Sequence, residues 1–389
     1  MKAELEIYIH IPFCEKKCNY CDFLSFRAGA EPQAAYVSQL IKELIVMSAE
    51  CANYSVSSVF VGGGTPSLLQ EEQITDIINT VRSLYDVSEH AEISIECNPG
   101  SIIRHKLAAY KSAGINRLSI GLQSADNAEL KLLGRIHSFE EFLKTYQAAR
   151  MEKFDNINVD LINCIPMQSM STWRKTLRTV TMLKPEHISV YNMIIEPGTP
   201  FYEMQQEGVL MMPSEDEQAE IDDFTRNYLK RSGYERYEFS NWARPGHACR
   251  HNRGYWQGVP YLGFGLGASS YFNGCRWKNT SEFSEYMEAD FDRKGLEAAE
   301  ELRREFRELS REEKMEEFMY LGLRCTDGVS EMNFNGRFGS RIEDIYGKQL
   351  AKYVGLGLMV HDGGKYRLTE HGIDVSNVIL SDFLLSDSL

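Results

Sequence analysis

The sequence contains no long apolar run. The first residues, MKAELEIYIHIPFC, lack the apolar core of a secretory signal peptide. No later segment approaches the roughly 20 consecutive apolar residues that a membrane-spanning helix needs. These absences predict a cytoplasmic protein without an intrinsic membrane segment. They also indicate that the nine cysteines are reduced rather than paired in disulfides.

An excess of positive charge is missing as well. The 389 residues include 42 Lys and Arg against 56 Asp and Glu, which gives a formal net charge of −14. A chain this acidic lacks the basic surface that attracts phosphate backbones and anionic lipids, so we expect no nucleic-acid partner. Hydrophobic residues make up 43% of the chain, which is typical of a globular protein with a large core.

The sequence also lacks a second cysteine pair. Cys14, Cys18 and Cys21 stand close together in CEKKCNYC, while the other cysteines are scattered. A structural zinc site commonly takes four ligands in two pairs, although His10 or Asp22 could still complete one here. An iron–sulfur cubane usually takes one cysteine per iron. The three cysteines therefore favour a cluster with one open iron, which a small molecule could occupy.

The first half of the chain alternates β-rich runs with helical patterns. Six such runs precede or separate the helical segments, at residues 5–11, 56–62, 91–97, 116–121, 157–162 and 187–194. Successive strand–helix units predict an α/β fold with a parallel sheet and helices outside it. Six units would form an incomplete (β/α)6 barrel. A doubly wound open sheet is the alternative, and the pattern separates the two poorly.

Polar residues follow the ends of these predicted strands. The cysteine loop follows the first strand and GGGTPS (62–67) the second, while Glu96 ends the third. Gln123 follows the fourth strand, Asp160 lies near the end of the fifth, and Tyr191 lies on the sixth. Since the carboxyl ends of barrel strands carry the active site, we expect these residues to converge on one face.

These motifs resemble the radical S-adenosylmethionine superfamily. The likeness continues through ECNPG (96–100), RLSIGLQS (117–124) and YEFSNWARPGHACRHNRGYW (237–256), and it covers nearly the whole chain. The chain is similar to the group that contains oxygen-independent coproporphyrinogen III oxidase (HemN) and its relative, the haem chaperone HemW. The resemblance implies a [4Fe-4S] cluster whose open iron binds the amino and carboxylate groups of S-adenosylmethionine.

The resemblance also implies particular site residues. Cys14, Cys18 and Cys21 would ligate the cluster. S-adenosylmethionine would be held by a larger set, namely Tyr8, Tyr20, Gly63, Gly64, Thr65, Glu96, Gln123, Arg135 and Asp160. Each of these has another interpretation when taken alone: GGG could be an ordinary turn, Asp160 a helix cap and Arg135 a solvated surface charge.

A haem site is implied by the motif HNRGYW (251–256). His251 could supply an axial imidazole, and Tyr255 and Trp256 offer flat apolar surfaces for a porphyrin. The alternative is a hydrogen-bonded structural histidine beside core aromatic residues.

Two departures separate the chain from the oxidase pattern. The oxidases resemble each other in a fourth cysteine where Phe23 stands, and in an extension before the position of Tyr8, where this chain has seven residues. Both departures match the HemW type. We therefore expect a haem chaperone that passes haem to acceptor proteins and takes electrons for its cluster from a donor.

Oxidative decarboxylation of coproporphyrinogen III to protoporphyrinogen IX is the alternative. Modification of tRNA fits the acidic charge poorly, and whether the protein is an enzyme stays open.

The sequence predicts three domains. A radical S-adenosylmethionine partial barrel would occupy residues 1–225, an extension with the HNxxYW motif 226–300, and a winged-helix-like α+β domain 301–389. Residues 300–318 are charged and strongly helical in composition. MVHDGGKYRLT (359–369) predicts a hairpin with its turn at Asp362-Gly363-Gly364. Acidic residues outnumber basic ones in this last domain, so we expect a lid or docking role rather than DNA binding.

Overall fold

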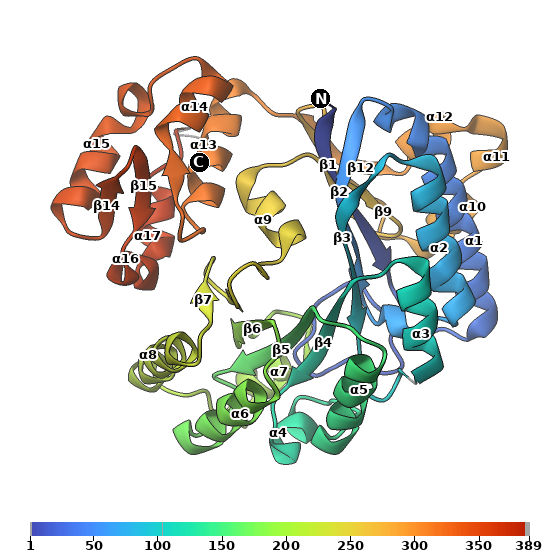
Figure 1. Ribbon diagram of the computed structural model, residues 1–389, viewed down its shortest axis with the longest axis horizontal. Helices are drawn as coiled ribbons and strands as arrows, with labels where there is room; N and C mark the ends of the chain where they lie inside the picture. Colours follow the sequence, from blue (N-terminus) through green and yellow to red (C-terminus); the bar gives the residue numbers. More distant parts are fainter. Residues whose placement is uncertain (1, 103, 386–389) are drawn as a thin grey trace.

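The computed structural model describes residues 2–102 and 104–385, and it is built around one large mixed sheet (Figure 1). The strand order is β12-β11-β10-β9-β1-β2-β3-β4-β5-β6-β8-β7. Its centre is a run of parallel strands in sequence order. These are β1 (Ala3–Ile11), β2 (Tyr54–Gly63), β3 (Val87–Cys97), β4 (Arg117–Gln123), β5 (Ile157–Asn163) and β6 (His187–Asn192). The six predicted strands and the incomplete barrel are confirmed.

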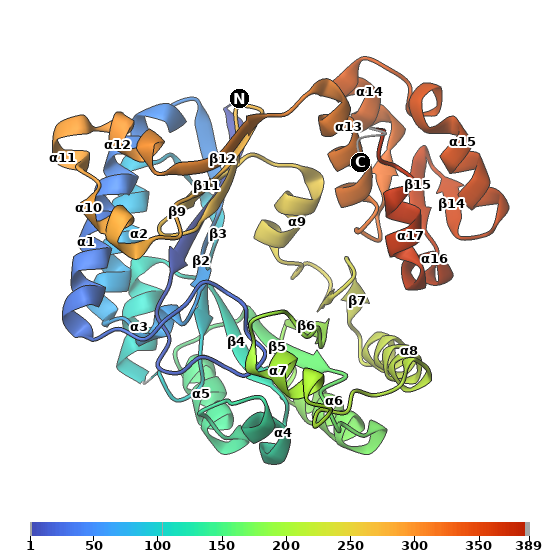
Figure 2. The same cartoon turned by 180° about the vertical axis from the view of Figure 1, so that it is seen from behind.

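The connections between these strands are helical and cover the outer side of the curved sheet (Figures 1 and 2). They comprise α1 (Ala30–Met47), η1 (Ser48–Cys51), η2 (Pro66–Leu68), α2 (Glu71–Leu84), α3 (Arg104–Ala113), α4 (Asn127–Leu132), α5 (Phe139–Met151) and α6 (Met170–Leu183). Strand β1 shows why the helices pack there. Leu5, Ile7 and Ile9 are fully buried in the core with these helices. Glu6 and Tyr8 alternate with them, so they face the inner side.

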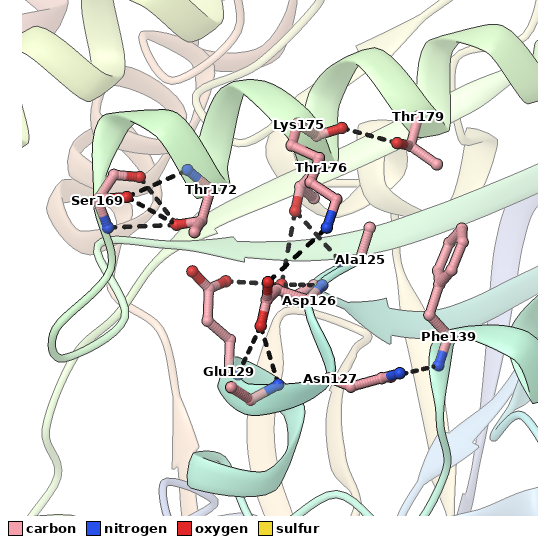
Figure 3. Close-up of polar contacts among 12 residues, drawn as sticks. Ala125, Asp126, Asn127, Glu129, Phe139, Ser169, Thr172, Lys175, Thr176 and Thr179 are labelled. Atoms are coloured by element: carbon pink, nitrogen blue, oxygen red, sulfur yellow. Dashed lines mark hydrogen bonds and ion pairs between the residues drawn. The ribbon is translucent and has the colours of Figure 1, made fainter.

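Strand β4 ends at Gln123, and a network of polar contacts fixes the loop that follows it. Figure 3 shows these contacts. Asp126 caps α4 by accepting the backbone N–H of Ala128. The Ala125 N–H donates to Thr176 Oγ1 on α6 at 3.2 Å, and the Ser124 hydroxyl donates to Glu129 at 2.6 Å. The loop is therefore tied to two helices, which holds the end of β4 in place.

Shorter strands extend the sheet at both ends. Beyond β1 lie β9 (Tyr261–Phe264), which is parallel to β1, and the antiparallel strands β10 (Ser269–Phe272), β11 (Cys275–Asn279) and β12 (Arg303–Glu308). Beyond β6 lie β8 (Asn241–Ala243) and β7 (Glu235–Arg236). The remaining helices of this part are α7 (Pro200–Gln206), α8 (Glu215–Arg231), α10 (Phe283–Glu288), α11 (Phe291–Lys294) and α12 (Leu296–Glu301).

The expected helix at residues 300–318 is wrong in its first half. Helix α12 ends at Glu301, and residues 303–308 form β12 instead. This segment is helical by composition, but its backbone pairs with β11 at the edge of the sheet. Arg303 also lies over the Trp277 ring at 4.5 Å. Pairing and packing of this kind outweigh weak local preference.

Helix α9 (Arg250–Gln257) lies on the inner side of the sheet, where Figure 1 shows it between the strands and the C-terminal helices. The carboxylate of Glu92 on β3 accepts the backbone N–H of Arg250 at 3.1 Å, at the first turn of this helix. His251 is hydrogen-bonded to Ser58 on β2 at 2.8 Å. Gly254 lies directly against Glu6 on β1. Three strands therefore hold α9 in position.

The C-terminal part has its own core, which runs from Met315 to Phe383. It contains α13 (Arg311–Gly322), β13 (Val329–Ser330), α14 (Glu331–Phe338), α15 (Ile342–Gly355), β14 (Met359–Asp362), β15 (Lys365–Leu368), α16 (Glu370–Asp374) and α17 (Ser376–Ser381). The predicted hairpin is confirmed, because β14 and β15 pair antiparallel across Gly363 and Gly364. Both glycines have positive φ, as the tight turn requires.

The main core spans Leu5 to Leu302, so the strands after residue 260 share the core of the barrel. We propose that the chain comprises three domains, at residues 1–225, 226–300 and 301–389. Among the described residues, no helix is long and apolar enough to cross a membrane.

The contact between α9 and β1 leads to a first prediction. A Cβ on Gly254 would overlap the Glu6 carboxyl group, which is fully buried. Gly254→Ala should therefore lower the free energy of unfolding, by about 1–3 kcal/mol, through overpacking. Gly336→Ala is the matched control, because Gly336 lies in α14 with nothing within 4 Å of the added Cβ. It should be neutral or stabilising by about 0.5–1 kcal/mol. Urea unfolding of both variants measures the difference, and a Gly254→Ala protein as stable as Gly336→Ala would contradict the tight seating of α9.

Candidate functional site

A cavity of about 990 Å³ opens on the inner side of the sheet, along the carboxyl ends of its parallel strands. This volume lies at the upper end of the range for small-molecule sites, about 300–1,000 Å³. Most of the residues predicted for the cluster and S-adenosylmethionine line it, and one predicted for haem does too. They are Cys14, Cys18, Tyr20, Cys21, Gly63, Gly64, Thr65, Glu96, Gln123, Arg135, Asp160 and Trp256. The structure therefore brings these side chains together from separate strands.

The cysteine loop leaves the end of β1 and is closed at its base. The Cys14 N–H donates to the carbonyl of Phe26 at 3.0 Å, and the Phe26 N–H donates to the carbonyl of Pro12. All three cysteines are half-buried free thiols. Cys14 Sγ lies 3.5 Å from Thr65 Oγ1, and burial raises the pKa of Cys21 to about 11. A bound metal would favour the thiolate form of Cys21 near neutral pH.

The surroundings of the loop fit a cluster better than a single zinc ion. Both ring nitrogens of His10 are engaged, Nε2 with the Leu24 carbonyl at 2.9 Å and Nδ1 with the Tyr8 hydroxyl at 3.1 Å. Asp22 is exposed. In the described part of the chain, no three His, Cys, Asp or Glu side chains come close enough to chelate one ion. Three separate thiols suit a cubane, in which each cysteine binds its own iron.

The glycine turn after β2 requires glycine for steric reasons. A Cβ on Gly63 would lie 2.6 Å from the His10 ring, and the φ of Gly63 is 113°. A Cβ on Gly64 would lie 2.7 Å from the Phe13 carbonyl oxygen. The backbone of this turn therefore packs closely against the cysteine loop, and the Gly63 N–H donates to Glu96 Oε2 at 3.0 Å. The turn is part of the site and not an isolated loop.

Two carboxyl groups face the cavity, Glu96 from β3 and Asp160 from β5, the strands on either side of β4. Asp160 accepts hydrogen bonds from Ser119 at 2.9 Å and Asn158 at 2.8 Å, both within the sheet. It caps no helix, so that alternative interpretation is excluded. Burial, and then the charge of Asp160, raises the pKa of Glu96 to about 8. Burial likewise raises the pKa of Asp160. A bound ammonium or hydroxyl group would stabilise the charged form of both.

Arg135 is half-buried and hydrogen-bonded, which rules out its alternative interpretation as a solvated surface charge. Its guanidinium donates to the Gly121 carbonyl at 2.9 Å, to the Asn98 side chain, and to Cys18 Sγ at 3.5 Å. Its positive charge therefore lies beside a thiol of the cysteine loop. Asn98 lies in the ECNPG motif (96–100), but only the fold shows that it contacts Arg135.

Three predicted residues do not line the cavity, namely Tyr8, His251 and Tyr255. Tyr8 lies on the inner face of β1, with its ring centroid 6.4 Å from that of His251. His251 is buried, with one ring nitrogen bonded to Ser58 at 2.8 Å and the other to the Tyr255 hydroxyl at 3.0 Å. Burial lowers the pKa of His251 to about 3. In this conformation neither nitrogen is free for haem iron, so haem ligation by His251 would require one of these two hydrogen bonds to break.

The far wall of the cavity was not foreseen from the sequence. It is formed by side chains from separate segments of the chain, among them Arg226, Arg236, Phe239, Trp242 and Arg324. Arg226 belongs to α8, Trp242 to β8, and Arg324 follows α13 of the C-terminal part. Phe239 and Trp242 lie within the segment 237–256 noted above, but no sequence pattern brings Arg226 or Arg324 beside them, and only the packing of the C-terminal part beside α9 completes the wall.

Comparisons with known proteins agree with this geometry. The model of the radical SAM superfamily matches residues 8–180, and that of the HemN C-terminal domain matches residues 309–375. The structure of coproporphyrinogen III oxidase (HemN) from Escherichia coli superposes with a TM-score of 0.84 at 25% identity, covering 99% of this chain and 91% of that one. The fold, with its three cysteines at the strand ends, defines a radical SAM protein.

Two curated relatives specify the class further. The heme chaperone HemW of Lactococcus lactis is 33% identical, covering 98% of this chain and 97% of the relative. That of Bacillus subtilis is 34% identical, covering 97% and 98%. The chain belongs to the HemW family of radical SAM proteins. Membership of the superfamily implies a [4Fe-4S] cluster and S-adenosylmethionine.

The raised pKa of Glu96 predicts a pH-dependent contribution to stability. The folded protein keeps a proton on Glu96 up to about pH 8, whereas the unfolded chain loses it near the ordinary glutamate pKa of 4.5. The unfolded state therefore binds fewer protons between these values, and the free energy of unfolding falls as pH rises through this window. Glu96→Gln removes the effect, so the stability of the variant relative to wild type should increase from about pH 5 to about pH 8.

Urea unfolding of ligand-free protein across this window measures the difference. Glu89→Gln, which changes an exposed carboxyl on the same strand, is the control and should follow the wild-type profile. A constant difference between Glu96→Gln and wild type would show that Glu96 is ionised in the folded state.

Proposed function

We propose that this protein is a haem chaperone that holds a [4Fe-4S] cluster, S-adenosylmethionine and haem, and delivers the haem to acceptor proteins. The observation that carries the proposal is the full-length similarity to proteins named heme chaperone HemW, which covers nearly all of both chains. The cavity supports it, because one continuous space connects the three cysteines with Trp256 of the HNxxYW motif.

The cluster end of the cavity has ligands for both small cofactors. Cys14, Cys18 and Cys21 would bind three irons, and the cluster, when bound, supplies electrons to S-adenosylmethionine at the fourth. Glu96 and Asp160 would accept hydrogen bonds from its ammonium or ribose hydroxyls. Tyr20 and Gln123 line the same end, and the backbone of residues 63–65 would border the methionine part. An electron donor is then a required partner.

Phe23 favours the chaperone over the oxidase. It lines the mouth of the cavity and its side chain is 63% exposed, at the position where the oxidases resemble each other in a fourth cysteine. A phenyl ring there supplies neither a thiol nor an acid to the cavity. The oxidase remains the second candidate, because the superposition on HemN extends over nearly the whole chain.

Replacement of single cysteines tests the cluster ligands. Cys14→Ala, Cys18→Ala and Cys21→Ala should each abolish or strongly reduce the iron content and the broad visible absorption of anaerobically reconstituted protein, because each change removes one iron ligand. Cys275→Ala is the matched control, since Cys275 is also a half-buried free thiol but does not line the cavity. Loss of the cluster in the Cys275→Ala protein would contradict the three-ligand assignment.

Parallel assays of one protein preparation separate the two candidate functions. The reconstituted protein should bind haem, seen as a saturable change in the Soret absorption, and should pass it to apoprotein acceptors. It should not decarboxylate coproporphyrinogen III under reducing conditions with excess S-adenosylmethionine, as measured by porphyrin chromatography.

Turnover of coproporphyrinogen III by wild type would favour the oxidase function over the chaperone function. His251→Ala provides a further comparison within the same assay. A changed haem spectrum would support ligation of the iron by His251 through a nitrogen that has given up its hydrogen bond to Ser58 or to Tyr255. An unchanged spectrum would leave His251 as a structural residue of α9.

A further inference from the structure

The far wall of the cavity contains an arginine without a polar partner. Arg324 lies with its guanidinium carbon 4.6 Å from the centre of the Trp256 ring and 4.8 Å from that of Phe239. Among the described residues, its side chain makes no hydrogen bond and no ion pair, and its Nε is buried. The indole N–H of Trp256 is buried without a partner as well. Two stacked side chains of this wall therefore each carry a donor without a partner.

The other arginines of the wall are already engaged. Arg226 pairs with Asp223 and, at 3.4 Å, with Asp374. Arg236 donates to the carbonyl of Phe239 at 3.1 Å. Arg324 thus differs from both in having its guanidinium held only by aromatic rings.

Glu238 feels the charge of Arg324, but among the described residues the two side chains form no ion pair. Glu238 is attracted by Arg324, yet its carboxylate accepts hydrogen bonds from the Ser240 N–H and the Asn241 side chain. Burial raises the pKa of Glu238, which further weakens it as a counter-ion. A guanidinium stays protonated in a protein, so Arg324 remains a cation at the wall of the cavity. A half-buried cation without a contacting anion is stabilised by an anionic ligand.

We propose that Arg324, together with Trp256, binds a carboxylate of a flat aromatic ligand, which under the proposed function is a propionate group of haem. Arginine is suited to this role, because its planar fork of donors matches a carboxylate and stacks on aromatic rings. The rings of Trp256 and Phe239 supply the apolar surface that a porphyrin needs.

The position of Arg324 gives the C-terminal part a role in the site. Trp256 belongs to α9, which is fixed to the barrel, while Arg324 directly follows α13 (Figure 1). A ligand bound to both residues would connect the two parts of the molecule. The proposal assigns the C-terminal part to the ligand site itself, and it rests on the proposed haem-binding function.

Two ligands and three variants test the proposal. Haem and haem dimethyl ester, in which both propionates are esterified, are titrated into full-length reconstituted protein. Arg324→Gln should weaken haem binding about tenfold to a hundredfold, as expected for loss of a charge-assisted hydrogen bond, but should leave ester binding unchanged. Arg324→Lys should recover part of the haem affinity, because the charge returns without the fork.

The control is Arg253→Gln. Arg253 joins α9 to the C-terminal part through an ion pair with Asp327 at 3.0 Å, but it does not line the cavity. Haem affinity in this variant should equal that of wild type. Circular dichroism and the unfolding midpoint verify that each variant is folded. If Arg324→Gln does not fold, Arg324→Lys must still bind haem more weakly than wild type does.

The outcomes distinguish this proposal from the proposed function. If wild type and Arg324→Gln bind haem equally well, the role of Arg324 is overturned. The proposed haem-chaperone function is not affected by that result. Equal losses of affinity for haem and for its dimethyl ester would show that Arg324 supports the aromatic wall and not a carboxylate. Wild type without measurable haem binding would overturn the haem-chaperone function and this proposal with it.

Discussion

The inner face of the sheet depends on one buried cation. Arg117 on β4 is almost fully buried, and its nearest counter-ion is Glu92 on β3 at 4.0 Å. Burial alone would lower the pKa of Arg117, but the surrounding acidic groups, including Glu92 and Asp160, raise it. An uncompensated charge in such a place would cost several kcal/mol, about 3–5 when one partner of a buried pair is removed. The acids of the inner face are therefore needed by the fold as well as by the site.

Glu92 transmits this constraint to the far side of the cavity. The same carboxylate that compensates Arg117 accepts the N–H of Arg250 and the thiol of Cys249, so it fixes the start of α9. Helix α9 is then only two turns long, and its orientation is set by this end and by the contact of Gly254 with Glu6. The place of Trp256 in the cavity wall follows from these contacts, since Trp256 lies at the other end of the helix.

Structural features that are repeated along the chain, or that depend on neighbouring residues, could be predicted from the sequence. The six central strands could be predicted because parallel strands covered by helices are nearly continuous apolar runs, such as that around Val59 and Val61. Their ends converge by the geometry of the barrel, so Glu96 and Asp160 could be placed in one site without knowing any contact. The hairpin at Gly363-Gly364 was equally predictable, because its turn chemistry is local.

Contacts between distant segments could not be predicted in this way. The strand at residues 303–308 depends on pairing with β11, which overrides its helical composition. The motif left open whether His251 is a haem ligand or a hydrogen-bonded structural residue, because its bond to Ser58, far away in the chain, depends on the fold. Arg324 carries no motif at all, and its isolation from acids becomes visible only when the C-terminal part is packed beside α9.

The two ends of the cavity favour ligand groups of opposite charge. At the cluster end, burial raises the pKa values of Glu96 and Asp160, and a cation or a strong hydrogen-bond donor beside them would stabilise their charged forms. At the far end, Arg324 is a cation without a contacting anion. S-adenosylmethionine carries an ammonium group, and haem carries two carboxylates. Under the proposed function each ligand therefore relieves a different electrostatic defect, so the two can occupy one cavity without competing for the same groups. The polarity of the cavity would also orient haem, with a propionate toward the C-terminal part and the remainder of the ring toward the cluster.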